Sequence, residues 1–330
     1  MRHLKWISAL LVLVVTVAQA EVTIVNASYD PTRELYQDYN AAFAKHWKET
    51  KNEDVTIKQS HGGSGKQARA IVDGLEADVA SLSVSFDIDV IAKAGLTSAD
   101  WRSKFPDDSS PYSSTVVFLV RKGNPKGVKD WDDLIKPGTG LLAPNPKTGG
   151  GARWIYLAAW GQALRKNGGG EAKAREFTQK FYANMLAMDQ AMRGSTTKFV
   201  RQGIGDVLVG WENEILQVIN EGKDKDEYQI VIPSDTITID VPIALVDKVV
   251  DKHGNREVAE AYVKWLWSKE GQEIIAKRFN RPRDPEIAKK YGAVFPAVKQ
   301  FTLKEVFGNW NDVMKKHFVD GAIFDSFSQK

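Results

Sequence analysis

The 330-residue sequence contains no cysteine, and its five histidines show no H-E-x-x-H or paired spacing. The first absence excludes thiolate nucleophiles, CxxC redox chemistry and cysteine-ligated zinc or iron–sulfur centres. The second leaves zinc without a histidine motif. We therefore expect neither a metal nor a cofactor.

An excess of one charge is also absent, since 45 basic residues stand against 42 acidic ones. Without Arg2 and Lys5, which belong to the leader described next, the counts are 43 and 42, a net charge of +1. Such a balance gives no reason to expect nucleic acid or an anionic membrane surface as a partner. A ligand must be recognised by local geometry rather than by a general electrostatic field.

Long apolar runs are confined to the N-terminus. Arg2 and Lys5 precede a nearly continuous apolar segment, residues 6–17, and residues 18–20 (Ala-Gln-Ala) form an A-x-A cleavage site. This pattern predicts a signal peptide over residues 1–20. No later stretch approaches the ~20 apolar residues of a transmembrane helix. Because residue 21 is not cysteine, we expect a freely diffusing periplasmic protein rather than a lipoprotein.

The rest of the chain alternates between strand-like and helix-like segments. Apolar residues at i+4 spacing predict an amphipathic helix of about 19 residues: Leu35, Tyr39, Phe43 and Trp47. The β-prone segments are residues 22–26, 55–58, 77–82, 114–120, 206–211, 228–232 and 241–246. This alternation predicts an α/β fold with a largely parallel sheet, and the length favours two lobes of about 150 residues each.

Three β-prone stretches end in small or capping residues that open a helix, at Asp30, at Ser64-Gly65 and at Gly149 to Ala152. In open α/β sheets ligands bind outside the carboxyl ends of the strands. Helix N-termini there offer unpaired N–H groups and the positive end of the dipole. The three turns together predict an anion held by backbone donors. Trp211 also follows a strand, so its indole either donates into a cleft or packs in the core.

Other interpretations of the glycine-rich turn at residues 62–65 are weaker. A P-loop would need glycine at Ser60 and Ser or Thr at Gln67, and a nucleophile elbow would need glycine at Lys66. His61 lies three residues before Ser64, which leaves a secreted Ser/His hydrolase as an alternative function.

Several longer motifs carry a family resemblance. They are residues 26–36 (NASYDPTRELY), 59–67 (QSHGGSGKQ), 145–153 (NPKTGGGAR), 193–196 (RGST), 203–208 (GIGDVL) and 281–284 (RPRD). In this order they closely resemble the periplasmic sulfate-binding proteins of ABC importers, to which thiosulfate-binding proteins are close relatives.

The resemblance implies a type II-like periplasmic binding protein fold, with two α/β lobes joined by a hinge and the ligand in the cleft between them. Residues 21–113 would form the first lobe and residues 114–236 the second. Residues 237–330 would return to the first lobe and complete it with the C-terminal helices. The implied function is high-affinity binding of sulfate and its delivery to a membrane ABC permease, by a monomer that catalyses nothing.

The resemblance also implies which groups donate to the anion. They are the backbone N–H groups of Asp30, Ser64, Gly150, Gly151 and Met192, and the indole N–H of Trp211. Met192 rests on the resemblance alone.

One position departs from the family pattern, because Gly149 stands where relatives have a serine whose hydroxyl donates to sulfate. A lost hydrogen bond to a charged group is worth roughly 1.5–3 kcal/mol. Thr148, a water or another glycine N–H could compensate; otherwise the site would favour thiosulfate or another oxyanion (molybdate, tungstate or phosphate). We regard Thr148, Gly149, His61 and Arg153 as supporting candidates, and Arg153 could equally form a surface salt bridge.

Overall fold

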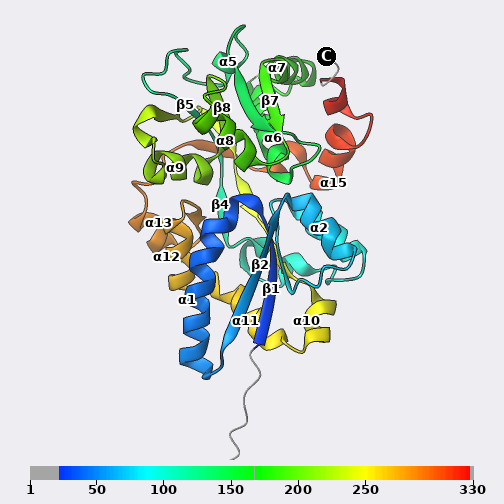
Figure 1. Cartoon of the computed structure of the whole chain (residues 1–330). Helices are drawn as coiled ribbons and strands as arrows, with labels where there is room; N and C mark the ends of the chain where they lie inside the picture. The colour runs from blue at the N-terminus through cyan, green and yellow to red at the C-terminus, as the bar shows by residue number, and fades with distance from the viewer. Residues whose placement is uncertain (1–21, 167, 328–330) are drawn as a thin grey trace, which may run out of the picture.

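The computed structural model describes residues 22–166 and 168–327, so the predicted signal peptide lies outside the described residues. Figure 1 shows two lobes, one above the other, each with its own sheet and surrounding helices. The prediction of a two-lobed α/β fold is confirmed. Within the described residues, no helix combines the length and the apolar character needed to cross a membrane.

The first lobe is built on a four-stranded sheet in the order β12-β3-β1-β2. Its strands are β1 (Val22–Tyr29), β2 (Val55–Gly62), β3 (Val79–Ser81) and β12 (Ile243–Leu245). β1 is parallel to β2 and β3, whereas β12 is antiparallel to β3. The helices of this lobe are α1 (Arg33–Lys51), α2 (Ser64–Val72), α3 (Ser85–Lys93), the short α4 (Pro106–Ser109), α10 (Asp247–His253), α11 (Arg256–Trp265), α12 (Lys269–Lys277) and α13 (Pro285–Lys290).

Helix α1 confirms the periodicity argument. It has 19 residues, and the four apolar side chains at i+4 spacing, Leu35, Tyr39, Phe43 and Trp47, are all buried. Tyr39 and Phe43 pack edge-on against Tyr262 of α11. The apolar stripe therefore anchors α1, and with it the turn at Asp30, to the body of the lobe.

The second lobe is built on a five-stranded sheet in the order β7-β6-β8-β5-β9. Its strands are β5 (Val116–Arg121), β6 (Leu141–Pro144), β7 (Met185–Asp189), β8 (Val207–Trp211) and β9 (Tyr228–Val231). β6 is parallel to β7 and β8, and β5 is antiparallel to β8 and β9. The helices of this lobe are α5 (Trp131–Leu134), α6 (Gly150–Lys166), α7 (Glu171–Ala183), α8 (Met192–Gln202) and α9 (Glu212–Glu221).

Two short sheets carry the chain between the lobes. β4 (Tyr112–Ser114) runs through Thr115 into β5, and the chain returns through β10 (Asp235–Ile237) and β11 (Ile239–Val241). β11 and β13 (Arg281–Pro282) flank β4, while β10 pairs with β14 (Lys299–Phe301). The Thr115 hydroxyl donates to the Ile237 carbonyl at 2.8 Å, so the two passages are tied to each other at the hinge.

The C-terminal segment lies against the second lobe, which differs from the expectation that residues 237–330 complete the first. After β14 follow α14 (Leu303–Phe307), α15 (Trp310–Val313), a π-helical turn η4 (Met314–Phe318) and a 3₁₀ turn η5 (Ile323–Ser326). Figure 1 shows α15 and the turns that follow it beside α6 and α7. Tyr156 of α6 bonds His317 at 2.9 Å and stacks edge-on against Phe318. Aromatic side chains at the end of the chain thus find their apolar surface on the second lobe.

Candidate functional site

The predicted turns of both lobes meet at one place. β1 and β2 pair in register up to Tyr29 and Gly62, so the chain segments that follow them, Asp30 and Ser64, lie at the same edge of the first sheet. The first turn of α6, at Gly150 and Gly151, faces them from the second lobe. A cavity lies between the lobes at this point. It is lined by Tyr29, Asp30, Pro31, Gly62, Gly63, Ser64, Ser83, Pro144, Gly149, Gly150, Gly151, Ala152, Ala191, Met192 and Trp211.

All six residues predicted as donors line this cavity, and so does Gly149. The volume of the cavity is about 20 Å³, little more than the ~10–15 Å³ needed to hold one water molecule. Pockets for organic ligands of drug size measure roughly 300–1,000 Å³. The cavity therefore suits a ligand of a few heavy atoms.

Helix N-termini supply most of the polar groups of the wall. Ser64, Gly150 and Met192 are the first residues of α2, α6 and α8, and Gly151 is the second residue of α6. The first four N–H groups of a helix have no acceptor within that helix, and the macrodipole adds about half a positive charge at this end. Three helices thus direct unpaired donors and positive potential at one small volume.

Cationic side chains take no direct part in the wall. Among the described residues that line the cavity none is lysine, arginine or histidine, and the one acidic residue is Asp30. The Asp30 carboxylate accepts hydrogen bonds from Arg33 Nε at 2.9 Å and Nη2 at 2.7 Å. Its charge is therefore neutralised by a neighbour on the same turn.

Ser64 is fixed by a buried carboxylate behind the cavity. Its hydroxyl donates to Asp87 at 2.5 Å and accepts from the backbone N–H of Ser83 at 3.0 Å. Burial raises the pKa of Asp87, and Arg153, whose Nη1 lies 3.6 Å away, opposes that shift. With the hydroxyl occupied, the backbone N–H is the group of Ser64 that is left for a ligand.

Trp211 closes one side of the cavity. The side chain is fully buried, and its ring packs against Tyr29 of the first lobe with 5.3 Å between ring centroids. Its indole N–H donates to the carbonyl of Gly151 at 2.9 Å. The predicted donor is thus at the site, and its proton is shared with the second glycine of α6.

The other supporting candidates do not line the cavity. Thr148 is exposed, and its hydroxyl lies 3.2 Å from the carbonyls of Asn145 and Gln190. Arg153 donates to the Pro146 carbonyl and faces Asp87, so it joins the two lobes beside the cavity.

His61 is separated chemically from Ser64. Its Nδ1 lies 2.6 Å from the hydroxyl of Ser28, whereas Ser64 bonds Asp87. Burial lowers the pKa of His61, and Arg33 lowers it further. The hydrogen bond on which a Ser64–His61 hydrolase would depend is not formed, because each residue has another partner. Among the described residues there is also no cluster of three or more potential metal ligands.

Further contacts hold the lobes together around the cavity. Arg193 of α8 bonds both carboxylate oxygens of Glu34 on α1, at 3.1 and 3.0 Å. The indole N–H of Trp154 on α6 donates to the carbonyl of Ser83 at 2.7 Å. These bonds join one lobe to the other, so the described arrangement is closed over the cavity.

Ser83 is a polar lining residue that the sequence analysis did not identify. It follows β3 by two residues, and a small polar residue after a strand is the same signal that identified Asp30 and Ser64. The signal is weaker at Ser83, which has neither the glycines that surround Ser64 nor a proline like the one that follows Asp30.

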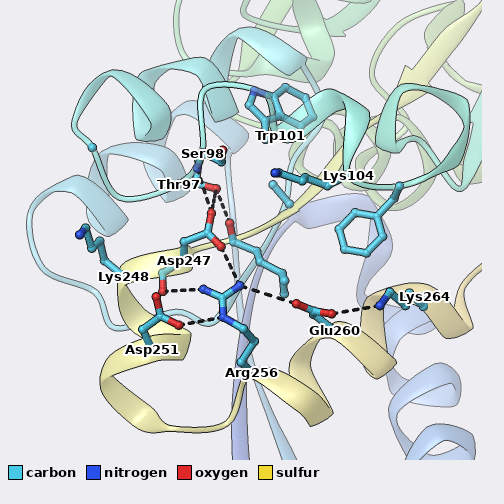
Figure 2. Close-up of a pocket in the computed structure, with 14 residues that line it drawn as sticks. Thr97, Ser98, Trp101, Lys104, Asp247, Lys248, Asp251, Arg256, Glu260 and Lys264 are labelled. Carbon is cyan, nitrogen blue, oxygen red and sulfur yellow. Dashed lines mark hydrogen bonds and ion pairs between the residues drawn. The ribbon is translucent and has the colours of Figure 1, made fainter.

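A larger cavity of about 550 Å³ lies on the outer side of the first lobe, and none of the predicted residues lines it. Figure 2 shows Arg256 surrounded there by Asp247, Asp251 and Glu260. The hydrogen bonds that Arg256 donates to Asp251 and Asp247 raise the pKa of Arg256. Three carboxylates thus pair with this arginine, which is not available to a ligand.

Comparisons with known proteins agree with this geometry. The family model described as bacterial extracellular solute-binding protein matches residues 24–279. The sulfate-binding protein of Escherichia coli K12 is 53% identical over 316 residues, which cover 96% of this chain and 95% of the relative. The thiosulfate-binding protein of Pseudomonas aeruginosa is 48% identical and covers 93% of this chain and 92% of the relative. Among solved structures, the sulfate-binding protein SubI of Mycobacterium tuberculosis superposes with a TM-score of 0.82 at 29% identity, covering 91% of this chain and 100% of that one.

Proposed function

This chain belongs to the family of bacterial extracellular solute-binding proteins, and on that premise we propose that it binds sulfate with high affinity in the periplasm and delivers it to a membrane ABC permease. The observation that carries the proposal is one small cavity lined by the N-termini of three helices from two lobes, without a cationic side chain among its described lining residues. The backbone N–H groups of Asp30, Ser64, Gly150, Gly151 and Met192 would hold the anion.

Uncharged donors suit a dianion that must later be released. Each helix N-terminus offers pre-oriented N–H groups, which lose no side-chain entropy when the ligand binds. Full positive charges would strengthen binding further but would also slow the release to a permease. In this proposal Arg33, Arg153 and Arg193 stay outside the lining and stabilise its walls.

The pairing of the Asp30 carboxylate with Arg33 bears on the choice between sulfate and phosphate. Hydrogen phosphate carries a proton that needs an acceptor, and leaving it unpaired in a closed site costs about 1–3 kcal/mol. Asp30, the one acidic side chain among the described lining residues, accepts two hydrogen bonds from Arg33, both at Oδ1. In this proposal its charge stays paired with Arg33 and does not accept the phosphate proton, so sulfate is preferred, and competition with phosphate tests this.

Thiosulfate is the second candidate ligand. The Pseudomonas aeruginosa relative is named a thiosulfate-binding protein. At Gly149 this chain also lacks a side-chain hydroxyl that could donate to an oxygen of sulfate. Both ligands would use the same helix N-termini, so competition between them decides which binds more tightly.

We further propose that binding is coupled to closure about the hinge at Thr115 and Ile237. Residues 22–113 and 237–298 would move as one body, and residues 114–236 and 299–327 as the other. The anion contacts both bodies only in the closed state, so it shifts the equilibrium towards closure. Residues 1–20 would act as a cleaved signal peptide without lipid attachment, and the mature chain would act as a monomer and catalyse no reaction.

Calorimetry on the mature protein, dialysed free of co-purified anions, tests the proposal. We expect sulfate to bind, to raise the melting temperature and to change tryptophan emission, with thiosulfate, phosphate, molybdate and tungstate as competitors. Trp211→Phe should weaken binding about 3- to 10-fold, because the indole exchanges one hydrogen bond for another. Trp131→Phe is the matched control, since this buried indole also donates to a carbonyl, that of Asp235, but far from the cavity. The absence of any heat or thermal shift at millimolar sulfate would contradict the proposal.

A further inference from the structure

Ser83 presents a hydroxyl without a partner to the cavity. The residue is fully buried, it lines the cavity, and its Oγ has no hydrogen-bond partner. A buried hydroxyl that lacks a partner costs about 1–3 kcal/mol, so such groups are rare in folded proteins unless something else satisfies them. The hydroxyl therefore needs a partner that the protein itself does not supply.

The backbone of Ser83 is held from both sides, which fixes where the hydroxyl can reach. Its N–H donates to Ser64 Oγ at 3.0 Å, and its carbonyl accepts the indole N–H of Trp154 at 2.7 Å. The first bond lies within the first lobe and the second crosses to α6 of the second lobe. Closure of the lobes thus brings Ser83 to the start of α6.

At that point the hydroxyl lies against the second lobe. A Cβ added to Gly150 would lie only 2.5 Å from Ser83 Oγ, so the hydroxyl abuts the first turn of α6. The nearest carboxylate, Asp87, is occupied, because it accepts from Ser64 and faces Arg153. The missing partner is therefore an acceptor within the cavity, and the oxygen of an oxyanion supplies one.

We propose that the Ser83 hydroxyl is a further donor to the bound oxyanion and contributes to its affinity. This assignment rests on the proposed function. It adds a hydroxyl donor in place of the serine hydroxyl that is missing at Gly149. That glycine has no hydroxyl, and the hydroxyl of Thr148 is directed to two carbonyls instead. Ser83 provides a side-chain hydroxyl from the opposite lobe, so the site keeps the hydroxyl donor that the resemblance implied.

The test compares sulfate titrations of the full mature protein with those of Ser83→Ala and Ser85→Ala. Ser85 is the matched control, because it starts α3 two residues later and does not line the cavity. We expect Ser83→Ala to weaken sulfate binding about 10- to 150-fold, the value of a hydrogen bond to a charged group, and Ser85→Ala to stay within about twofold. Ser83→Cys, which keeps the shape but donates weakly, should fall between Ser83→Ala and the wild type.

A melting curve without sulfate separates ligand binding from a structural role. Because Ser83→Ala removes a buried hydroxyl that has no partner, the ligand-free melting temperature should stay the same or rise while the affinity falls. A fall in both, or an unchanged affinity in a wild-type protein that binds sulfate, would overturn the assignment of Ser83 and leave the proposed function intact. A wild-type protein that ignores sulfate would instead overturn the proposed function.

Discussion

Gly150→Ala tests whether ligand binding requires the lobes to meet as described. A Cβ on Gly150 would lie 2.5 Å from Ser83 Oγ, 3.0 Å from Ser64 Cβ and 3.1 Å from Asp87 Oδ2. All three atoms belong to the first lobe, whereas Gly150 opens α6 of the second. The added methyl group therefore clashes only in the closed state.

The expected magnitude follows from overpacking. One extra methyl group in a filled site costs about 1–3 kcal/mol, which corresponds to a loss of sulfate affinity of about 5- to 150-fold. The ligand-free protein can relieve the clash by opening. Its melting temperature should stay the same or rise slightly, because alanine loses less backbone entropy than glycine in a helix, by up to ~1 kcal/mol.

The assay is calorimetry with sulfate, supported by small-angle scattering of the ligand-free and sulfate-loaded protein. Gly65→Ala is the matched control, because Gly65 does not line the cavity and its Cβ would meet only Asp87 of the same lobe, at an ordinary 3.6 Å. This control should bind and close as the wild type does. Wild-type affinity in Gly150→Ala would refute the claim that the ligand is held between lobes in contact at this glycine.

Three further predictions concern charge. The hydrogen bond to Asp78 raises the pKa of His253 above 6.5, so its stabilising contribution is present below that pH and is lost as the pH rises through the folded-state value. Between about pH 6 and about pH 9, urea unfolding should show a smaller loss of stability in His253→Asn than in the wild type. An equal loss in the two proteins would contradict this. Burial lowers the pKa of His317 to about 3, so stability falls as the pH drops from 6.5 towards that value, and His317→Gln should flatten the slope. Glu34→Gln keeps one oxygen acceptor but removes the charge that faces Arg193 across the lobes. Because this pair is partly exposed, the change should weaken sulfate binding by up to about fivefold at low salt and by less at ~1 M salt. A salt-independent effect would count against this role.

Much of the fold could be predicted because its signals are local and periodic. The i+4 spacing from Leu35 to Trp47 predicted α1, since a 3.6-residue period places those side chains on one buried face. Small or capping residues after β-prone runs predicted the turns at Asp30, Ser64 and Gly150, which all line the cavity.

Other features depend on tertiary contacts that no local pattern reveals. The predicted strand at residues 241–246 is divided into β11 and β12 at Pro242, which has no N–H for a sheet ladder. β7 (Met-Leu-Ala-Met-Asp) contains no β-branched or aromatic residue, so its strand propensity is weak. The C-terminal helices join the second lobe because Tyr156 and its aromatic neighbours accept them, and this surface is assembled from distant segments.

The hydrogen bonds already present around the cavity determine how much each donor contributes to sulfate affinity. The indole N–H of Trp211 must break its hydrogen bond to the Gly151 carbonyl before it can donate to an anion. Its contribution to the binding free energy is therefore the difference between two hydrogen bonds. The Ser83 hydroxyl breaks no existing hydrogen bond when it donates to the anion. Its contribution to the binding free energy is therefore that of a whole hydrogen bond to a charged group. Ser83→Ala should therefore cost more sulfate affinity than Trp211→Phe, although tryptophan is the larger and more conspicuous residue. The reverse order in one set of titrations would mean that the indole, rather than the hydroxyl, lacks a competing partner in the ligand-free protein.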